Sequence, residues 1–193
     1  MKSKILNFLR NLLFKKSGYK YSLFGINRFK YVYTQTNGLS HFFGTYESEI
    51  KEYIIKKSKD ANLIFNIGAA YGYYASYFSK STNNIVLFEP DKNSCKKLKE
   101  LSQLINFDFK IINKFVSSYD DKNTISLNNS FEMYGIPDFI KVDIEGGEET
   151  LLDKSYELIK EHKIRMIIEL HSLEIENKIL RNLKKLEIKY KKI

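Results

Sequence analysis

Short apolar runs alternate with helix-like stretches from residue 62 to residue 185, and this alternation constrains the fold more than any other feature. The apolar runs predict strands at 62–67, 84–88, 109–115, 138–142 and 165–170. The stretches between most of them predict helices at 71–80, 91–105, 147–160 and 172–185. All of the strands except the third are nearly continuous in apolar residues, as strands buried on both faces are. The sequence therefore predicts an α/β fold with an open, mostly parallel sheet and helices on both faces.

The first 60 residues lack this alternation and are predicted to form an appendage, so that the main domain spans residues 61–193. Residues 1–16 have the apolar spacing of a basic amphipathic helix. Residues 28–44 contain alternating apolar residues, an Asn37-Gly38 pair and a second aromatic run. This pattern predicts a β-hairpin that turns at Asn37-Gly38.

Three further segments carry expectations about local structure. A helix is predicted from Thr45, with Thr45 as its N-cap and Glu47 in its first turn. Residues 116–137 are expected to be mostly loop, with a short strand near 124–127. Residues 186–192 have the alternation of a sixth strand.

The net charge of +9 comes almost wholly from lysine, because arginine occurs only at positions 10, 28, 165 and 181. Proteins that read nucleic acids use arginine for bidentate contacts, so the composition favours solvated lysines over a nucleic-acid partner. The sequence contains no stretch of about 18 apolar residues, so no transmembrane helix is predicted. The single cysteine fits a reducing compartment, and a cytoplasmic location is expected. Residues 1–16 either pack on their own domain or bind an anionic membrane surface or a partner, and a homodimer also remains open.

The first and second predicted strands end in residues that suit a nucleoside cofactor, because open α/β sheets bind ligands at the carboxyl ends of their strands. A glycine-rich turn follows the first strand, and Glu89 comes about 20 residues after Gly68, a spacing that suits a ribose with two free hydroxyls. The turn is G-x-x-x-G, and bulky tyrosines stand where a pyrophosphate needs an open helix N-terminus. This pattern favours a cofactor without a pyrophosphate. The candidate cofactor-binding residues are Asn66, Gly68, Ala69, Tyr71, Gly72, Glu89 and Pro90.

Ionisable residues gather at the ends of the fourth and fifth predicted strands. In a sheet of strand order 3-2-1-4-5 these two strands are neighbours, so their polar ends converge beside the cofactor. Two interpretations remain open, a structural ion-pair cluster that caps the sheet and a reaction centre. The candidate catalytic residues are Lys141, Asp143, Glu145, Glu169 and His171.

Four motifs together resemble the FkbM-type family of S-adenosylmethionine-dependent methyltransferases: IFNIGAAYGYY, VLFEPD, IPDFIKVDIEGGEETLL and MIIELH. The resemblance implies the Rossmann-like sheet of class I methyltransferases and S-adenosyl-L-methionine as cofactor. It also implies that residues 68–72 form the loop beside the methionine part of the cofactor and that Glu89 binds its ribose. Asp143, Glu145 and the Glu169–His171 pair would then line the methyl-transfer pocket. The chain departs from the family at Asn66, where aspartate is usual, and it leaves no residues for the last antiparallel strand of the full sheet.

The resemblance further implies O-methylation of a sugar, a glycan or another small hydroxylated acceptor. Such a transfer needs a base, and His171 is the best one by its intrinsic pKa. Asp143 is expected to orient the acceptor hydroxyl or to act as the base, and Lys141 is predicted to pair with Asp143 or Glu169. No metal ligand is assigned, although a divalent cation bound by these carboxylates remains open. An RNA or protein methyltransferase that uses the lysine-rich surface and a non-catalytic cofactor-binding relative remain alternatives.

Overall fold

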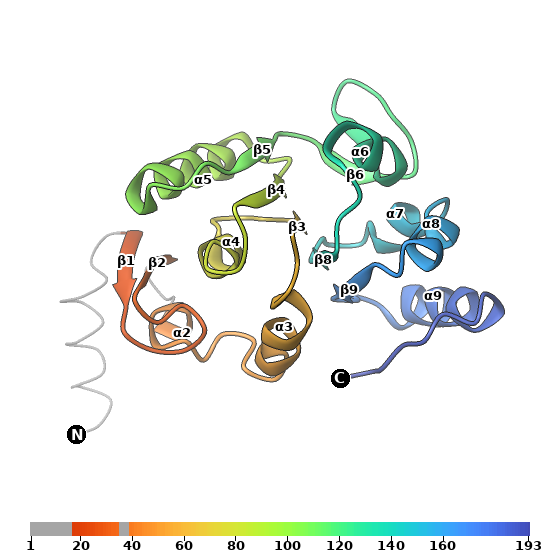
Figure 1. Cartoon of the computed structure of the whole chain (residues 1–193), viewed down its shortest axis with the longest axis horizontal. Coiled ribbons are helices and arrows are strands. Elements are labelled where there is room, and N and C mark those ends of the chain that lie inside the picture. The colour runs from red at the N-terminus through yellow and green to blue at the C-terminus, as the bar shows by residue number, and fades with distance from the viewer. Residues whose placement is uncertain (1–16, 35–38) are drawn as a thin grey trace.

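The computed structural model of the chain describes residues 17–34 and 39–193, and its centre is a sheet of five parallel strands (Figure 1). These strands are β3 (Leu63–Ile67), β4 (Asn84–Phe88), β5 (Lys110–Ile112), β8 (Phe139–Val142) and β9 (Arg165–Ile168). Their order is β5-β4-β3-β8-β9, and every neighbouring pair is parallel. The predicted order 3-2-1-4-5 is therefore confirmed, although the third predicted strand, 109–115, is too long, because β5 ends at Ile112 and Phe115 belongs to another sheet. The carboxyl end of β3 lies between those of β4 and β8, where the sequence places the site.

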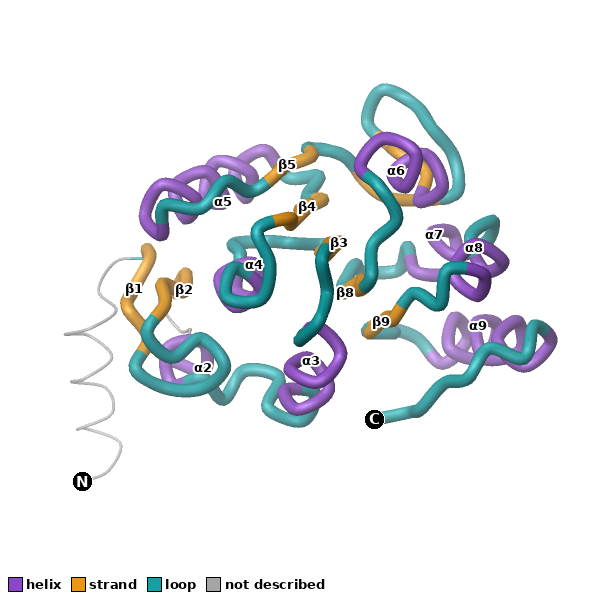
Figure 2. Tube along the Cα trace, in the orientation of Figure 1, coloured by secondary structure: helices purple, strands orange, loops and turns teal. Residues whose placement is uncertain are grey.

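Helices cover both faces of this sheet (Figures 1 and 2). Successive side chains of a strand point to opposite faces, so Ile64 and Phe65 begin two separate apolar cores. The core around Ile64 includes residues of α3 (Lys51–Ser58), α4 (Tyr73–Phe78) and α5 (Lys92–Ile105). The core around Phe65 includes residues of α6 (Leu127–Tyr134), α7 (Glu148–Leu152), α8 (Tyr156–Glu161) and α9 (Leu173–Lys185). The predicted fold class, a Rossmann-like sheet with helices on both faces, is confirmed.

One predicted helix is divided in two. Residues 147–160 form α7 and α8, with a turn between them in which the amide of Ser155 donates to the carbonyl of Leu152 at 2.9 Å. The hydroxyl of Ser155 also donates to the side-chain oxygen of Asn128 at 2.8 Å. Serine side chains that hydrogen-bond outside the helix weaken helix continuity, and this accounts for the break.

The predicted hairpin over residues 28–44 is wrong. The observed hairpin pairs β1 (Gly18–Ser22) with β2 (Lys30–Thr34), and the second aromatic run forms the short helix α2 (Leu39–Phe43). Tyrosines alternate along both strands, and they meet across the hairpin in two edge-to-face pairs, Tyr19–Tyr33 at 5.3 Å and Tyr21–Tyr31 at 5.4 Å between ring centroids. Such cross-strand aromatic pairs stabilise this register. The Asn37-Gly38 pair lies outside the described residues.

The helix predicted from Thr45 starts later than expected. Residues 46–50 form turns, and α3 begins at Lys51 with Ile50 as its N-cap, so Thr45 is not the cap. Glu47 adopts a positive φ of 45° and does not lie in a helix. Its carboxylate accepts a 2.6 Å hydrogen bond from the hydroxyl of Tyr74 on α4. A tertiary contact therefore overrides the local helix signal.

Two predictions about the second half of the chain need correction. Residues 116–137 are not mostly loop, because β6 (Phe115–Ser117) pairs with β7 (Thr124–Ser126) and α6 follows, although the short strand near 124–127 is confirmed. Residues 186–192 form no strand. This tail instead runs back towards α3 (Figure 1), where Lys191 lies 4.7 Å from the ring centroid of Tyr53. Lys192 forms an ion pair with Glu176 of α9.

The described part of the predicted appendage packs on the sheet. Ile26, Val32 and Ile54 are buried in the same core as Ile64 and Phe78. The domain boundary at residue 60 stays a prediction, and the predicted amphipathic helix at 1–16 lies outside the described residues. Within those residues, every helix is too short or too polar to cross a membrane.

Candidate functional site

The glycine-rich turn brings the end of β3 against the end of β8. Gly68 has a φ of +79°, and a Cβ atom at this position would lie 1.8 Å from the carbonyl oxygen of Asp143. The amides of Gly68 and Ala69 both donate to the carbonyl of Phe88 on β4, at 3.0 and 3.1 Å. Gly72 has a φ of +84°, and a Cβ there would lie 2.5 Å from Leu101 of α5. The two glycines thus allow close contacts with β8 and α5, which no other residue type permits without strain.

Glu89 ties the turn after β3 to the turn after β4. Its carboxylate is buried and accepts hydrogen bonds from the amides of Ala70 at 2.7 Å and Asp91 at 2.9 Å. Burial raises the pKa of Glu89 above its usual range. The side-chain amide of Asn113 donates to the carbonyls of Glu89 and Pro90, at 2.9 and 2.8 Å. Asn113 follows β5 and therefore fixes the end of β4 from the neighbouring strand, a role that its sequence context did not signal.

A pocket opens at the carboxyl end of β3, and four of the predicted cofactor residues line it: Asn66, Gly68, Ala69 and Tyr71. Gly72, Glu89 and Pro90 do not line it, although Glu89 accepts a hydrogen bond from the amide of the lining residue Ala70. Asn66 is 2% exposed, and its side-chain oxygen has no hydrogen-bond partner among the described residues. A buried polar atom without a partner is costly and is rare in native structures. This oxygen is therefore a candidate contact for a bound ligand.

The opposite wall of the pocket is aromatic and comes largely from the N-terminal segment. Tyr33 of β2 packs against Tyr71, with ring centroids 4.5 Å apart, and His41 of α2 stacks on Tyr46 at 4.1 Å. The sequence prediction missed Tyr33, His41 and Tyr46, because it placed this region in a different hairpin and helix. The aromatic run itself was the available signal, but its position over the sheet depends on tertiary packing.

Lys141 lies on β8, two residues before Asp143, and is 1% exposed. Its ammonium is 2.8 Å from Oδ2 of Asp143, which confirms the predicted pairing, and 3.9 Å from Oε2 of Glu47. It also lies 4.8 Å from the ring centroid of Tyr74, whose hydroxyl donates to Glu47. Glu47 was missed as a site residue, since its turn was predicted to be helical.

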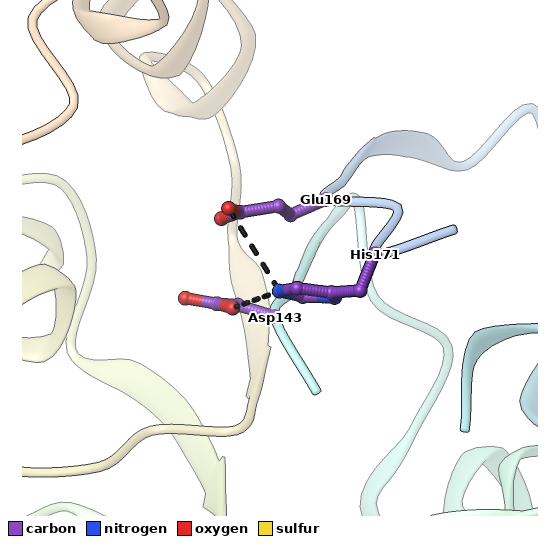
Figure 3. A group of neighbouring side chains, drawn as sticks. All are labelled: Asp143, Glu169 and His171. Carbon is purple, nitrogen blue, oxygen red and sulfur yellow. Dashed lines mark ion pairs between the residues drawn. The ribbon is translucent and has the colours of Figure 1, made fainter. Parts of the chain in front are cut away.

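His171 joins a second group of acids at the ends of β8 and β9. Figure 3 shows Asp143 and Glu169 pointing towards His171, whose Nε2 lies 3.9 Å from Oδ1 of Asp143 and 3.8 Å from Oε1 of Glu169. The other ring nitrogen, Nδ1, lies 2.5 Å from Oε1 of Glu148, which is fully buried. This contact with Glu148 raises the pKa of His171. Glu145, a predicted catalytic residue, is exposed and lies outside this cluster.

Glu148 was missed because the motif that follows β8 offers three acids in close succession, and only the start of α7 decides which one faces inwards. Glu148 is the first residue of α7, and Glu145 precedes the helix in a bend. The pKa of Glu169 is raised, first by burial and then by the charge of Asp143. The cluster therefore concentrates negative charge beside the pocket.

Residues 102–187 match the profile of the methyltransferase FkbM domain. This part of the chain is therefore similar to the methyltransferase FkbM domain. The matched residues include β8, β9, Asp143 and His171, whereas the glycine-rich turn and Glu89 precede them. The structure joins both parts in one sheet and one site, so the resemblance inferred from the sequence is confirmed.

Solved structures of methyltransferases share this fold. The FkbM methyltransferase from Methylobacillus flagellatus KT is 17% identical with a TM-score of 0.51, and the match covers 64% of this chain and 37% of that one. The C-terminal domain of precorrin-6Y C5,15-methyltransferase from Rhodobacter capsulatus is 10% identical with a TM-score of 0.51, covering 72% and 70%. The tRNA (uracil-54, C5)-methyltransferase from Pyrococcus abyssi, solved with S-adenosyl-L-homocysteine, is 11% identical with a TM-score of 0.50, covering 79% and 35%. No curated protein matched the sequence. These similarities concern the fold, and the match spans only 37% of the length of the Methylobacillus protein.

Proposed function

We propose that the chain is an S-adenosyl-L-methionine-dependent methyltransferase that methylates a hydroxyl oxygen of a sugar, a glycan or another small hydroxylated acceptor. The family and the fold support a methyltransferase. The observation that carries the cofactor assignment is the buried, unpartnered oxygen of Asn66 in the pocket at the end of β3. A cofactor ammonium group is a donor that would satisfy this oxygen.

The remaining pocket residues fit the other parts of this cofactor. The carboxylate of Glu89 has acceptor capacity beyond the two backbone amides that it binds, and it lies at the strand end where a ribose is expected. Tyr71 and Tyr33 provide an aromatic wall that suits an apolar or cationic group. When bound, S-adenosyl-L-methionine supplies an electrophilic methyl group on a positively charged sulfur. The acids beside the pocket favour a ligand of that charge.

Transfer to a hydroxyl oxygen requires that the hydroxyl proton is removed. Asp143 lines the pocket, and its Oδ2 is held by Lys141, which leaves Oδ1 facing His171. Asp143 can therefore orient an acceptor hydroxyl or take its proton. The assignment of His171 as the base remains a prediction from the sequence.

Removal of the Glu89 carboxylate is expected to weaken cofactor binding. The parent should bind S-adenosyl-L-homocysteine with micromolar affinity, about −7 to −8 kcal/mol, in isothermal titration calorimetry. Glu89→Ala should raise the dissociation constant about 10- to 100-fold, because hydrogen bonds to a charged acceptor contribute about 1.5–3 kcal/mol.

Glu132→Ala is the matched control, because Glu132 is exposed on α6 and does not line the pocket. Its affinity should equal that of the parent. Thermal unfolding of Glu89→Ala should show an intact cooperative transition, which separates lost binding from lost folding. Binding of NADH in place of S-adenosyl-L-homocysteine by the parent would contradict the proposed function.

A further inference from the structure

We propose that Asp143, Glu169 and His171 bind one divalent metal ion beside the pocket. Each side chain offers one ligand atom, and these atoms lie within 4.8 Å of one another. Figure 3 shows the three side chains converging from the ends of β8 and β9. Asp143 and His171 are about one-third exposed and Glu169 is about half exposed, so an ion can reach them from solvent.

The spacing within this group fits a shared cation better than direct hydrogen bonds. Nε2 of His171 is 3.9 Å from Oδ1 of Asp143 and 3.8 Å from Oε1 of Glu169, whereas hydrogen bonds between nitrogen and oxygen measure about 2.7–3.2 Å. Three polar side chains therefore face one another without bonding directly. Metal–ligand bonds of about 2.0–2.2 Å place neighbouring ligand atoms about 2.8–3.6 Å apart, so small side-chain rotations would bring these atoms onto one ion.

Glu148 supplies an independent observation. Metal-binding histidines generally donate their second ring N–H to a carboxylate, which fixes the ring and leaves the other nitrogen free for the metal. Here Nδ1 of His171 lies 2.5 Å from Oε1 of the fully buried Glu148, so Nε2 is the nitrogen turned towards Asp143 and Glu169. The second oxygen of Glu148 is buried and has no partner among the described residues. A cation bound at Nε2 would offset the charge of this buried carboxylate through the neutral ring that lies between them.

The charges around the site also favour a bound cation. Four carboxylates meet here, those of Glu47, Asp143, Glu148 and Glu169, and within the described residues Lys141 is the one lysine or arginine paired with them. Lys141 contacts Oδ2 of Asp143, so Oδ1 remains available as a ligand. A dication would offset most of the excess negative charge.

The ligand set selects the class of ion. One imidazole nitrogen with two carboxylate oxygens suits Mn²⁺ or Zn²⁺, whereas Ca²⁺ and Mg²⁺ favour sites made wholly of oxygen. As a ligand, His171 would orient the ion next to Asp143 and would not serve as the base. Ion binding needs neither cofactor nor acceptor, so it can be tested apart from the proposed function.

The test is a titration of the chelator-treated full chain with Mn²⁺. Binding is measured as the loss of the free-ion signal in electron paramagnetic resonance. We expect one ion per chain with a dissociation constant in the micromolar range. His171→Ala should raise that constant at least tenfold. His162→Ala is the matched control, because His162 is exposed at the end of α8, and it should bind Mn²⁺ as the parent does.

Glu148→Gln tests the positioning role. Loss of such an outer partner typically costs about 10- to 100-fold in metal affinity, so we expect at least a tenfold rise in the dissociation constant while the unfolding midpoint of the metal-free protein changes little. Equal Mn²⁺ affinity in the parent and His171→Ala, or no Mn²⁺ or Zn²⁺ binding by the parent, would overturn the site. If the parent binds S-adenosyl-L-homocysteine but neither Mn²⁺ nor Zn²⁺, the metal site is wrong and the proposed function stands. If the parent binds an ion but not S-adenosyl-L-homocysteine, the metal site stands and the proposed function is wrong.

Discussion

Gly68→Ala is expected to lower the free energy of unfolding by about 2–5 kcal/mol. A non-glycine residue at positive φ costs about 1–2 kcal/mol, and forcing an extra carbon into a packed site costs about 1–3 kcal/mol more. The second cost is large here because the new Cβ would lie 1.8 Å from the backbone oxygen of Asp143, which moves only if β8 moves. Urea denaturation at equilibrium measures the change.

Gly146→Ala is the matched control for this substitution. Gly146 has a similar φ of +82°, but a Cβ there meets no atom within 4 Å. It should therefore show only the backbone cost, about 1–2 kcal/mol. Equal destabilisation by the two substitutions would contradict the close approach of β3 to β8 that shapes the pocket.

Lys141→Met should lower the free energy of unfolding by about 2–4 kcal/mol in the metal-free protein. Lys141 is 1% exposed and lies 2.8 Å from Asp143, so its loss leaves a partly buried carboxylate without a countercharge. Breaking a fully buried ion pair costs about 3–5 kcal/mol, and the partial exposure of Asp143 reduces this figure. Lys96→Met, on the exposed side of α5, should change stability by less than about 0.5 kcal/mol.

A double variant separates lost charge pairing from lost packing. If the unpaired carboxylate causes the destabilisation, adding Asp143→Asn to Lys141→Met should restore about 1–2 kcal/mol of the free energy of unfolding. Strictly additive losses in the two variants would show that Lys141 acts through packing alone, against the ion-pair role described above.

The sheet was predictable because parallel strands buried on both faces are encoded as continuous apolar runs. The run at 84–88 coincides with β4, and the run at 62–67 differs from β3 by one residue. The N-terminal elements were not predictable in this way. Their hairpin depends on which tyrosines meet across β1 and β2, and the aromatic run at 39–43 forms a helix that packs on that hairpin.

The candidate site was likewise predictable only in part. Asn66, Gly68 and Asp143 follow from the rule that ligands bind at strand ends, and all three line the pocket. Glu47 reaches Tyr74 from a turn that local propensity reads as helix, and no pattern in the sequence links the two. The choice of Glu148 over Glu145 depends on where α7 begins, and helix boundaries are the part of a fold that sequence patterns define least well.

The central claim, methyl transfer to a hydroxyl group, is tested most directly with methyl-labelled S-adenosyl-L-methionine. The chain would be incubated with the labelled cofactor, Mn²⁺ and parallel panels of saccharides, RNA and proteins. The proposed function predicts label in a saccharide or another hydroxylated small molecule as an ether, with S-adenosyl-L-homocysteine formed in equal amount, and no label with Glu89→Ala at low cofactor concentration. Label found only in RNA or protein, or cofactor binding without transfer to any acceptor, would contradict it.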